Sequence, residues 1–335
     1  MVGCSADLPI HGMERANCLT CTTTAAFSTL ATRVEARPDF PNRLVKLIVP
    51  VPPGAQLDAV ARIVAERLSA KWHQPVIIEN RPGAAGSIGA EVVAKAEPDG
   101  HTLFVTHPGP LVTNQWLYSK LAYDPSSLVA VTVLVTLPPV LVTNSNLRVS
   151  NFSEFLTYAR ANQGKITYGS PGAGSTPHLA MEELAYTAGL RFIHVPYQGL
   201  APAQRELLGG HIDVMIDMAG NVLPQLSEGK LKVLAVTGDK RLAQLSQVPT
   251  VSESVSNCAF TDWFAVAAPP KTPEALANHI SRSFADALQD ASVAQRMRDF
   301  AIVPVGNSPA AAKTFFAQEG RHWRKIIDAT RIKVE

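Results

Sequence analysis

The chain has 335 residues and a formal charge of +2; 46% of its residues are hydrophobic and 17% are charged. This length exceeds a single core, and the apolar fraction excludes a disordered protein, so we expect a globular protein with two α/β lobes. The chain lacks lysine and arginine runs and basic residues interleaved with aromatic ones, which argues against a nucleic-acid partner.

The first 36 residues differ in character from the rest, and we expect residues 1–36 to be a leader. A weakly apolar run over residues 18–31 precedes Val34-Glu35-Ala36, which has the small residues of a leader-peptidase site at positions −3 and −1. This run carries five threonines, two cysteines and a serine where a signal peptide has leucines. A signal peptide, a disordered tail and a misassigned start therefore stay open. No stretch reaches the roughly 18 apolar residues of a membrane span.

Three of the four cysteines lie in this leader, so Cys258 is the sole cysteine of the body. An intramolecular disulfide is therefore excluded after processing. Cys18 and Cys21 have no second Cys or His pair at metal-binding spacing, and we expect no metal site. Cys258 is expected to be an inert core residue, because no motif marks it as a nucleophile.

The body begins with a strand, a turn and a helix. Residues 46–51 are strand-like, Pro52-Pro53-Gly54 turns the chain, and apolar residues at helical spacing follow over residues 58–71. A second strand is expected over residues 74–79 and a third over residues 102–106, with a helix at residues 90–96 between them. Asp58, at the first helix start, is interpreted as a capping residue or a ligand contact.

A long apolar run over residues 129–143 is interrupted by Pro138-Pro139. Proline pairs do not sit inside a central strand, so this run is expected to leave one sheet and enter another. Strands and helices then alternate, which predicts mainly parallel sheets. The chain returns through residues 260–268 and ends in helices opened by Thr272-Pro273 and Ser308-Pro309. We therefore expect one lobe from residues 37–138 and 260–335, another from residues 139–259, and two hinge strands.

The most informative stretch is Gly169-Ser-Pro-Gly-Ala-Gly-Ser-Thr-Pro-His178. It follows an apolar run and precedes a helical pattern, so its glycines and hydroxyls lie on the approach to a helix. Thr176 is expected to be the N-cap and Pro177 the first helical residue. Free N–H groups, hydroxyls and the positive end of a helix dipole converge there, which favours binding of a carboxylate or a phosphate. A flexible loop is the alternative.

Several ordered motifs resemble the Bug family, the TctC-like extracytoplasmic solute receptors of tripartite tricarboxylate transporters. The resemblance runs from about Pro38 to the C-terminus. The motifs are Leu47-Ile48-Val49-Pro50 with Pro52-Pro53-Gly54 and Asp58, Glu79-Asn80-Arg81-Pro82-Gly83-Ala84, Pro98-Asp99-Gly100, Gly172-Ala173-Gly174-Ser175-Thr176-Pro177-His178-Leu179, Val195-Pro196-Tyr197-Gln198-Gly199, Ile212-Asp213-Val214-Met215 and Val248-Pro249-Thr250.

This resemblance implies a periplasmic receptor with the type II, Venus-flytrap fold of periplasmic binding proteins, which closes over a small organic anion. The anion could be a mono- or dicarboxylate, aromatic or not, or an amino acid. The implied partners are the large and small membrane subunits of a tripartite transporter, or a sensor protein. A monomer without a cofactor and without enzymatic activity is expected.

The resemblance also implies the site residues. One lobe would contribute Gly54, Ala55 and Gln56, and the turn after the third strand would add Thr106, His107 and Gly109. The other lobe would contribute Ser170, Ala173, Gly174, Ser175 and Thr176, with His178, Tyr197 and Asp217 in or behind the cleft. Tyr197 could equally be a core residue, and His194 is interpreted as a core histidine.

The chain departs from the family pattern at the first turn, where Ala55-Gln56-Leu57 replaces a glycine and a small hydroxyl-rich pair. His107-Pro108 likewise replaces small polar residues after the third strand. We expect Leu57 to present an apolar surface at the cleft, and Gln56 and His107 to offer new contacts. The ligand would then differ from the commonest di- and tricarboxylates.

The alternative function is an α/β enzyme acting on a small carboxylate or a nucleotide-like ligand. Gly83-x-x-Gly86-x-x-Gly89 lies between a strand and a helix, but its spacing is not that of a dinucleotide site, and the next strand ends without an acidic residue. Ser175 and His178 could imitate a Ser-His pair, although no orienting acid is marked.

Overall fold

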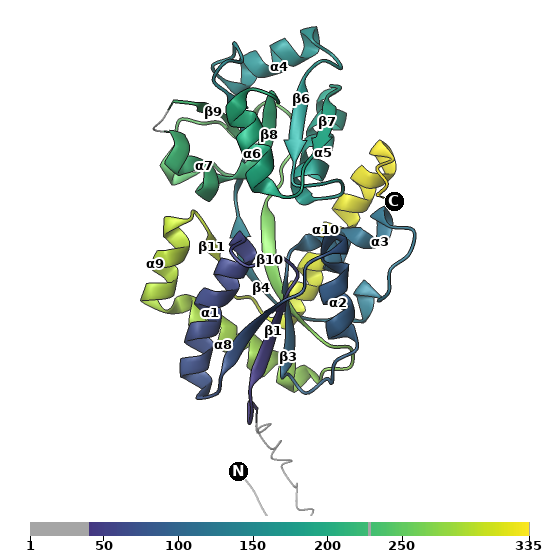
Figure 1. Cartoon of the computed structure of the whole chain (residues 1–335), viewed down its shortest axis with the longest axis vertical. Helices are drawn as coiled ribbons and strands as arrows, with labels where there is room; N and C mark the ends of the chain where they lie inside the picture. Colours follow the sequence, from purple (N-terminus) through teal and green to yellow (C-terminus); the bar gives the residue numbers. More distant parts are fainter. Residues whose placement is uncertain (1–39, 227–228, 335) are drawn as a thin grey trace, which may run out of the picture. The chain divides into compact units, whose positions relative to one another are not determined.

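The computed structural model describes residues 40–226 and 229–334 (Figure 1). The chain divides into Met1–Arg37 and one compact body, Pro38–Glu335. The predicted leader therefore lies outside the described residues. The strands of the body are β1 (Val45–Val49), β2 (Val76–Asn80), β3 (Thr102–Thr106), β4 (Val129–Leu137), β5 (Pro139–Asn144), β6 (Thr167–Ser170), β7 (Ile193–Pro196), β8 (Val214–Met218), β9 (Leu231–Val236), β10 (Asp262–Ala268) and β11 (Val303–Pro304).

Ten α-helices are found in the described part of the chain, with short 3-10 turns between some of them. The π-helix η2 (Gly109–Thr113) lies between β3 and α3. The α-helices are α1 (Gln56–Trp72), α2 (Ser87–Ala94), α3 (Asn114–Leu117), α4 (Phe152–Ala161), α5 (Thr176–Ala188), α6 (Leu200–Gly209), α7 (Ala219–Leu226), α8 (Glu274–Gln289), α9 (Ala291–Asp299) and α10 (Pro309–Thr330). None of the helices within residues 40–226 and 229–334 has the length and apolar character that crossing a membrane requires.

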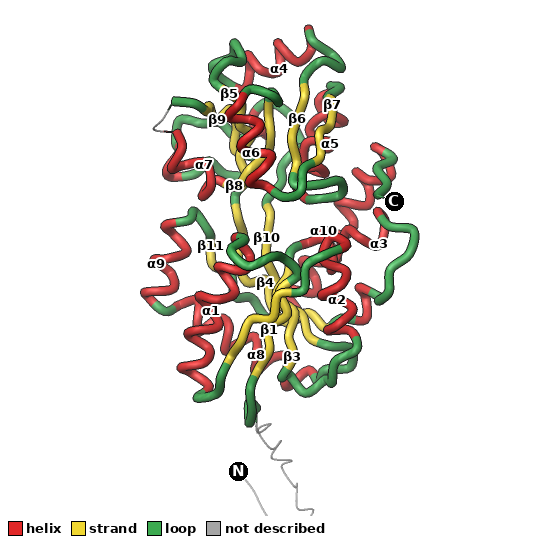
Figure 2. Tube along the Cα trace, in the orientation of Figure 1, coloured by secondary structure: helices red, strands yellow, loops and turns green. Residues whose placement is uncertain are grey.

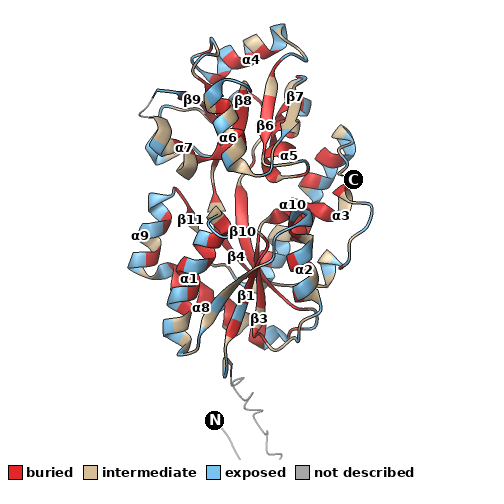
Figure 3. Cartoon of the chain, in the orientation of Figure 1, coloured by how far each residue is buried: buried red, intermediate tan, exposed pale blue. Residues whose placement is uncertain are grey.

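The strands form two sheets, of order β11-β4-β10-β3-β1-β2 and β7-β6-β8-β5-β9 (Figure 2). Side chains that alternate along a strand point to opposite faces of a sheet. In β1, Leu47 and Val49 accordingly join the core beneath α1 and α8, while Ile48 joins the core on the opposite face. Figure 3 shows these strands buried between helices whose outer faces are exposed.

The chain passes between the sheets at the proline pair, as the sequence predicts. β4 ends at Leu137 in the six-stranded sheet, and β5 begins at Pro139 in the five-stranded sheet. β10 then returns to the first sheet, where it pairs antiparallel with β3 and β4. The residue boundaries of the two predicted lobes stay a prediction.

The prediction of mainly parallel sheets is wrong. Only β1-β2, β1-β3, β6-β7 and β6-β8 are parallel pairs, whereas the other five pairs of described strands are antiparallel. Local strand-helix units do produce the parallel pairs. The strands next to the crossings between the sheets, such as β5 and β10, run antiparallel to their neighbours. The alternation of strands and helices along the sequence does not reveal the direction of these strands.

Phe40, the first described residue, packs against the body. Its ring lies edge-on to Trp72 and His101, with centroids 5.4 Å and 5.1 Å away. Such edge-to-face contacts add to the stability that burial provides. The packed body therefore extends to at least Phe40.

We expect a chain that begins at Arg37 to fold with an unchanged melting temperature, because it keeps Phe40 and every described contact of the body. Differential scanning fluorimetry of this shortened chain against the full chain measures the effect. Phe40→Ala is the matched control and should lower the melting temperature in both. A drop of several degrees on shortening alone would show that residues before Arg37 stabilise the body.

Candidate functional site

In α/β sheets, ligands bind outside the carboxyl ends of the parallel strands. Most of the predicted site residues lie at the loops after β1, β3 and β6, strands that each belong to a parallel pair, whereas Tyr197 follows β7 and Asp217 lies within β8. Each loop leads to a helix, so backbone N–H groups of the first helical turn are available there. That residues 54–56 and 173–176 face one another across a cleft stays a prediction.

The loop after β1 is held from within by Asp58. Its Oδ2 accepts from the Gly54 N–H and from Arg62 Nε, both at 2.9 Å, and its Oδ1 accepts from Asn80 Nδ2 at 2.9 Å. Burial alone would raise the pKa of this carboxyl, but the hydrogen bonds from Arg62, Asn80 and Gly54 hold the pKa below its usual value. The side chain is fully engaged and 2% exposed, which favours the loop-capping interpretation over ligand contact.

The first two residues of α1, Gln56 and Leu57, have different surroundings. The Gln56 Nε2 donor is buried and has no acceptor among the described residues. Leu57 is 3% exposed and packs in the core beneath the six-stranded sheet. The expectation that Leu57 presents an apolar surface at the cleft is therefore wrong, because the helical turn directs it into the protein interior.

The turn after β3 holds its histidine in the neutral form. His107 Nδ1 accepts from the Gly109 N–H at 3.2 Å, so its proton lies on Nε2. Although the residue is partly exposed, burial lowers its pKa to about 4. His107 can donate a hydrogen bond to a ligand, but it carries no positive charge at neutral pH. Thr106, also in this turn, is fully buried.

Asn114, at the start of α3, is a residue that the sequence did not reveal. Its Nδ2 donates to Ala85 O and Ser87 Oγ, both at 3.1 Å, while its buried Oδ1 has no donor within the described residues. A Cβ atom at Gly109 would lie 3.1 Å from this oxygen. Gln56 and Asn114 thus leave one buried donor and one buried acceptor without a hydrogen-bond partner among the described residues, next to the loops after β1 and β3. Such atoms are uncommon, because buried polar atoms normally have a hydrogen-bond partner.

The loop after β6 differs from expectation at its cap. The N-cap of α5 is Ser175, and Thr176 is the first helical residue, so Pro177 occupies the second position. Ser175 has the extended backbone of an N-cap but makes no side-chain cap bond; its Oγ donates instead to Gly172 O at 2.6 Å. Proline is tolerated at either position because the N–H groups of the first turn lack helical acceptors.

Hydroxyls and several N–H groups of this loop are used internally. The Gly172 N–H donates to Ser170 Oγ at 3.2 Å, and the Gly174 N–H donates to His178 Nδ1 at 2.9 Å. Ser170 itself is fully buried. The groups left to meet a ligand are the N–H groups of Ala173 and of the first turn of α5, at Thr176 and His178.

Three rings stack behind this loop. His178 lies 3.9 Å from His194 between centroids at an interplanar angle of 8°, and Tyr168 lies 4.8 Å from His194. Burial, with a smaller contribution from His194, lowers the pKa of His178 to about 3, and burial lowers that of His194 to about 4. Both imidazoles are therefore neutral at neutral pH. The His194 side chain is hydrogen-bonded, with its Nε2 atom 2.6 Å from Ser170 Oγ.

Tyr197 and Asp217 lie beside the loop. Tyr197 is partly buried, and its N–H donates to Ser170 O at 2.9 Å. Asp217 is 1% exposed and accepts from Met218 N, Asn221 Nδ2 and Gln204 Nε2 at 2.7, 2.9 and 3.1 Å. Burial raises the pKa of this carboxyl to about 6. These contacts favour a supporting role for Asp217 over direct ligand contact.

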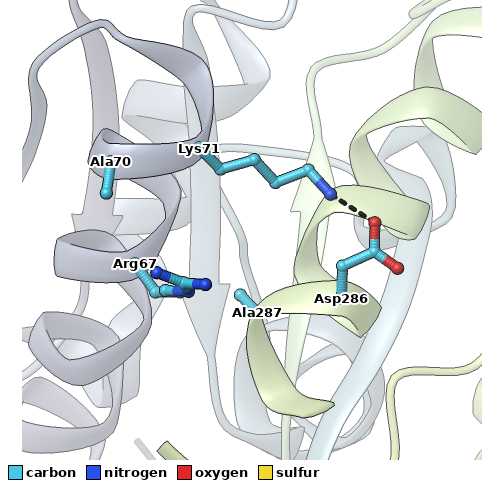
Figure 4. A pocket seen from close by; sticks show the side chains of 5 residues that line it. All are labelled: Arg67, Ala70, Lys71, Asp286 and Ala287. Carbon is cyan, nitrogen blue, oxygen red and sulfur yellow. Dashed lines mark hydrogen bonds and ion pairs between the residues drawn. The ribbon is translucent and has the colours of Figure 1, made fainter. Parts of the chain in front are cut away.

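A small hollow at the surface lies between α1 and α8 and is lined by Arg67, Ala70, Lys71, Asp286 and Ala287 (Figure 4). Lys71 pairs with Asp286 across it, and Arg67 pairs with Asp290 at 3.0 Å. Its charges are neutralised by one another, and it contains none of the loop residues.

The geometry does not support the enzymatic alternative. Ser175 Oγ is bonded to Gly172 O and His178 Nδ1 to Gly174 N, so the two side chains do not form a nucleophile-base pair. Ser170 does lie beside His194, but it is fully buried. Cys258 is buried, and burial raises the pKa of its thiol to about 12, which confirms the prediction of an inert core residue.

Comparison with known proteins gives consistent matches. The model of the family described as "Tripartite tricarboxylate transporter family receptor" (TctC) matches residues 60–332. Protein BugT of Bordetella pertussis is 31% identical over 299 residues, 88% of this chain and 92% of its own. Rpa4515 of R. palustris, solved with adipate, has a TM-score of 0.81 and 34% identity, covering 88% of this chain and 99% of its own. MatC of Rhodopseudomonas palustris, solved with malate, has a TM-score of 0.76 and 30% identity, covering 86% and 100%.

Proposed function

Since this chain belongs to the TctC family of periplasmic solute-binding receptors, we propose that it captures a small organic carboxylate with the loops after β1, β3 and β6. The matches confirm the resemblance to Bug receptors, the periplasmic binding protein fold with two mixed α/β lobes, and a family of receptors without enzymatic activity. The identity of the ligand is the proposal.

The chemistry of the loops supports a carboxylate. None of the predicted site residues is a lysine or an arginine, and Arg62, beside the first loop, is already paired with Asp58. Compensation of a negative charge therefore falls to backbone N–H groups, the Gln56 amide and the dipoles of α1 and α5. Two relatives, Rpa4515 and MatC, were solved with adipate and with malate, which are both dicarboxylates.

The single observation that carries the proposal is the orphan Gln56 Nε2 donor at the start of α1. A buried donor without an acceptor costs free energy, and a ligand carboxylate supplies the acceptor. The N–H groups at the start of α5 would bind the same anion from the other lobe. We propose that closure of the lobes around it creates the form that membrane subunits of a tripartite transporter, or a sensor, recognise.

Thermal-shift screening of a carboxylate library that includes adipate and malate tests the proposal, because a ligand bound only by the native state raises the melting temperature. Calorimetry then gives the affinity. A library in which no carboxylate shifts the melting temperature, while a ligand without a carboxylate does, would contradict the proposal.

We expect Gln56→Met to weaken binding of the best carboxylate roughly ten- to a hundredfold, since a hydrogen bond to a charged group contributes about 1.5–3 kcal/mol. The stability of the free protein should be unchanged or higher, because the orphan donor is removed. Calorimetry and denaturation measure the two effects. Gln225→Met is the matched control: Gln225 in α7 also has an orphan buried atom, but it lies outside the loops. Equal affinities in Gln56→Met and Gln225→Met would place Gln56 outside the site.

A further inference from the structure

His194 lies on β7, the edge strand of the five-stranded sheet, directly opposite Tyr168 of β6. From there its ring contacts both ends of the loop after β6. Its Nε2 lies 2.6 Å from Ser170 Oγ, at the point where the loop begins. Its face covers His178, in the first turn of the helix where the loop ends, at 3.9 Å between ring centroids.

Each of these two contacts continues into the backbone of the loop. Ser170 Oγ accepts the Gly172 N–H at 3.2 Å, and His178 Nδ1 accepts the Gly174 N–H at 2.9 Å. Ser170 Oγ is also hydrogen-bonded to His194 Nε2, and its hydroxyl has Gly172 O at 3.1 Å as a second acceptor, so either Ser170 or a neutral His194 can supply the proton of the Ser170–His194 bond. His178 must carry its proton on Nε2. The side chain of His194 is thus linked through one residue on each side to the two glycine amides of the loop.

The contact between the Gly174 N–H and His178 Nδ1 requires the His178 imidazole to be neutral. A proton on His178 Nδ1 would remove the acceptor of the Gly174 N–H, whereas the His194–Ser170 bond forms with the proton on either atom, because the Ser170 hydroxyl can donate to Gly172 O instead. The groups that face the pair are Tyr168, which lies beside His194 on the neighbouring strand with its ring centroid 6.2 Å from that of His178, and Glu182, which accepts from the Tyr168 hydroxyl at 2.5 Å. Burial keeps the pKa of both histidines well below neutral.

We propose that His194 is a positioning residue of the ligand site: by holding Ser170 and His178, it fixes the loop of residues 172–176 so that the N–H groups at the start of α5 face the ligand. This inference rests on the proposed function, because the value of an ordered loop is that it binds without further loss of conformational entropy. A histidine that only fills space would act through its volume and not through its Nε2 atom.

Two variants separate the two contacts. His194→Phe keeps a planar ring on His178 but removes the hydrogen bond to Ser170, whereas His194→Gln places an amide near the position of Nε2 but removes the stack. We expect His194→Phe to weaken binding of adipate or malate about five- to tenfold, the loss of one hydrogen bond's contribution. Ser170→Ala should weaken it similarly, and the double variant His194→Phe/Ser170→Ala should be no weaker than either single variant.

A readout without ligand distinguishes failure of this inference from failure of the proposed function. Hydrogen exchange of the Gly172 amide should accelerate about tenfold in His194→Phe, and that of the Gly174 amide in His194→Gln, even if neither adipate nor malate binds. By NMR, the midpoint of the His178 titration should rise in both variants, because His194 no longer opposes its charge. His211→Gln, on an exposed histidine paired with Glu206, is the control and should change none of these quantities. Unchanged glycine exchange and additive losses of affinity in the double variant would overturn the proposal.

Discussion

Replacing Asp58 with alanine should lower the free energy of unfolding by about 3 kcal/mol and abolish measurable ligand binding. The substitution leaves Gly54 N, Arg62 Nε and Asn80 Nδ2 without their shared acceptor, and hydrogen bonds to a charged group contribute about 1.5–3 kcal/mol each when they are made. Urea denaturation followed by circular dichroism measures the loss. Asp58→Asn, which keeps the size and one acceptor oxygen, should lose roughly half as much.

The Asp58 carboxyl also makes the stability of the folded protein depend on pH. Its pKa in the folded protein is lower than its ordinary value of 3.8, so its contribution to stability is complete above that value and is lost as the pH falls through the folded pKa. His178 and His194 act in a higher window: their folded pKa values of about 3 and 4 lie below the ordinary 6.5, so their contribution to stability declines as the pH falls from 6.5 toward 4.

Denaturation between pH 7 and pH 3 separates these contributions. Asp58→Ala should keep the decline between pH 6.5 and pH 4 and lose part of the decline below it. Asp124→Ala is the control, because Asp124 also caps a helical turn but lies at the surface. A stability of Asp58→Ala that matches Asp124→Ala at every pH would show that Asp58 does not hold the loop.

Much of the fold follows from local signals in the sequence. The proline pair at 138 and 139 marks the passage from one sheet to the other because a proline lacks the N–H that a central strand needs. Ser308 caps α10 through its hydroxyl, as its place before Pro309 predicts. The strand-turn-helix units that begin with β1, β2 and β6 were also predictable, since turn residues and apolar periodicity are read from neighbouring residues.

The parts that could not be predicted depend on contacts between distant residues. His194 is opposite Tyr168 through sheet pairing and touches His178 through the packing of α5, so no short motif reveals it. Asn114 gains its orphan oxygen only because Ala85 and Ser87 take its donor group. The hydroxyls of Ser170 and Ser175 were expected to meet the ligand; in the structure both are hydrogen-bonded to Gly172, Ser170 Oγ by accepting its N–H and Ser175 Oγ by donating to its carbonyl oxygen.

Leu57→Ser should lower the free energy of unfolding by about 3 kcal/mol without changing the preference between adipate and malate. Leu57 is 3% exposed within the core beneath the six-stranded sheet. Removing a buried leucine side chain leaves a cavity, and the serine hydroxyl would be buried in apolar surroundings. Thermal and urea denaturation measure the stability, and calorimetry with both dicarboxylates measures the preference.

Ala55→Gly is the matched variant at the same turn, and it should be close to neutral for stability. Ala55 is the N-cap of α1 with an extended backbone, φ −67° and ψ 157°, which needs no glycine, and glycine is accepted at this position at least as well as alanine. Among the three residues of the first turn that depart from the family pattern, only Gln56 then offers a polar side chain to the ligand, so the selectivity set by this turn should follow residue 56. A Leu57→Ser protein of unchanged stability with a reversed preference between adipate and malate would instead place Leu57 against the ligand.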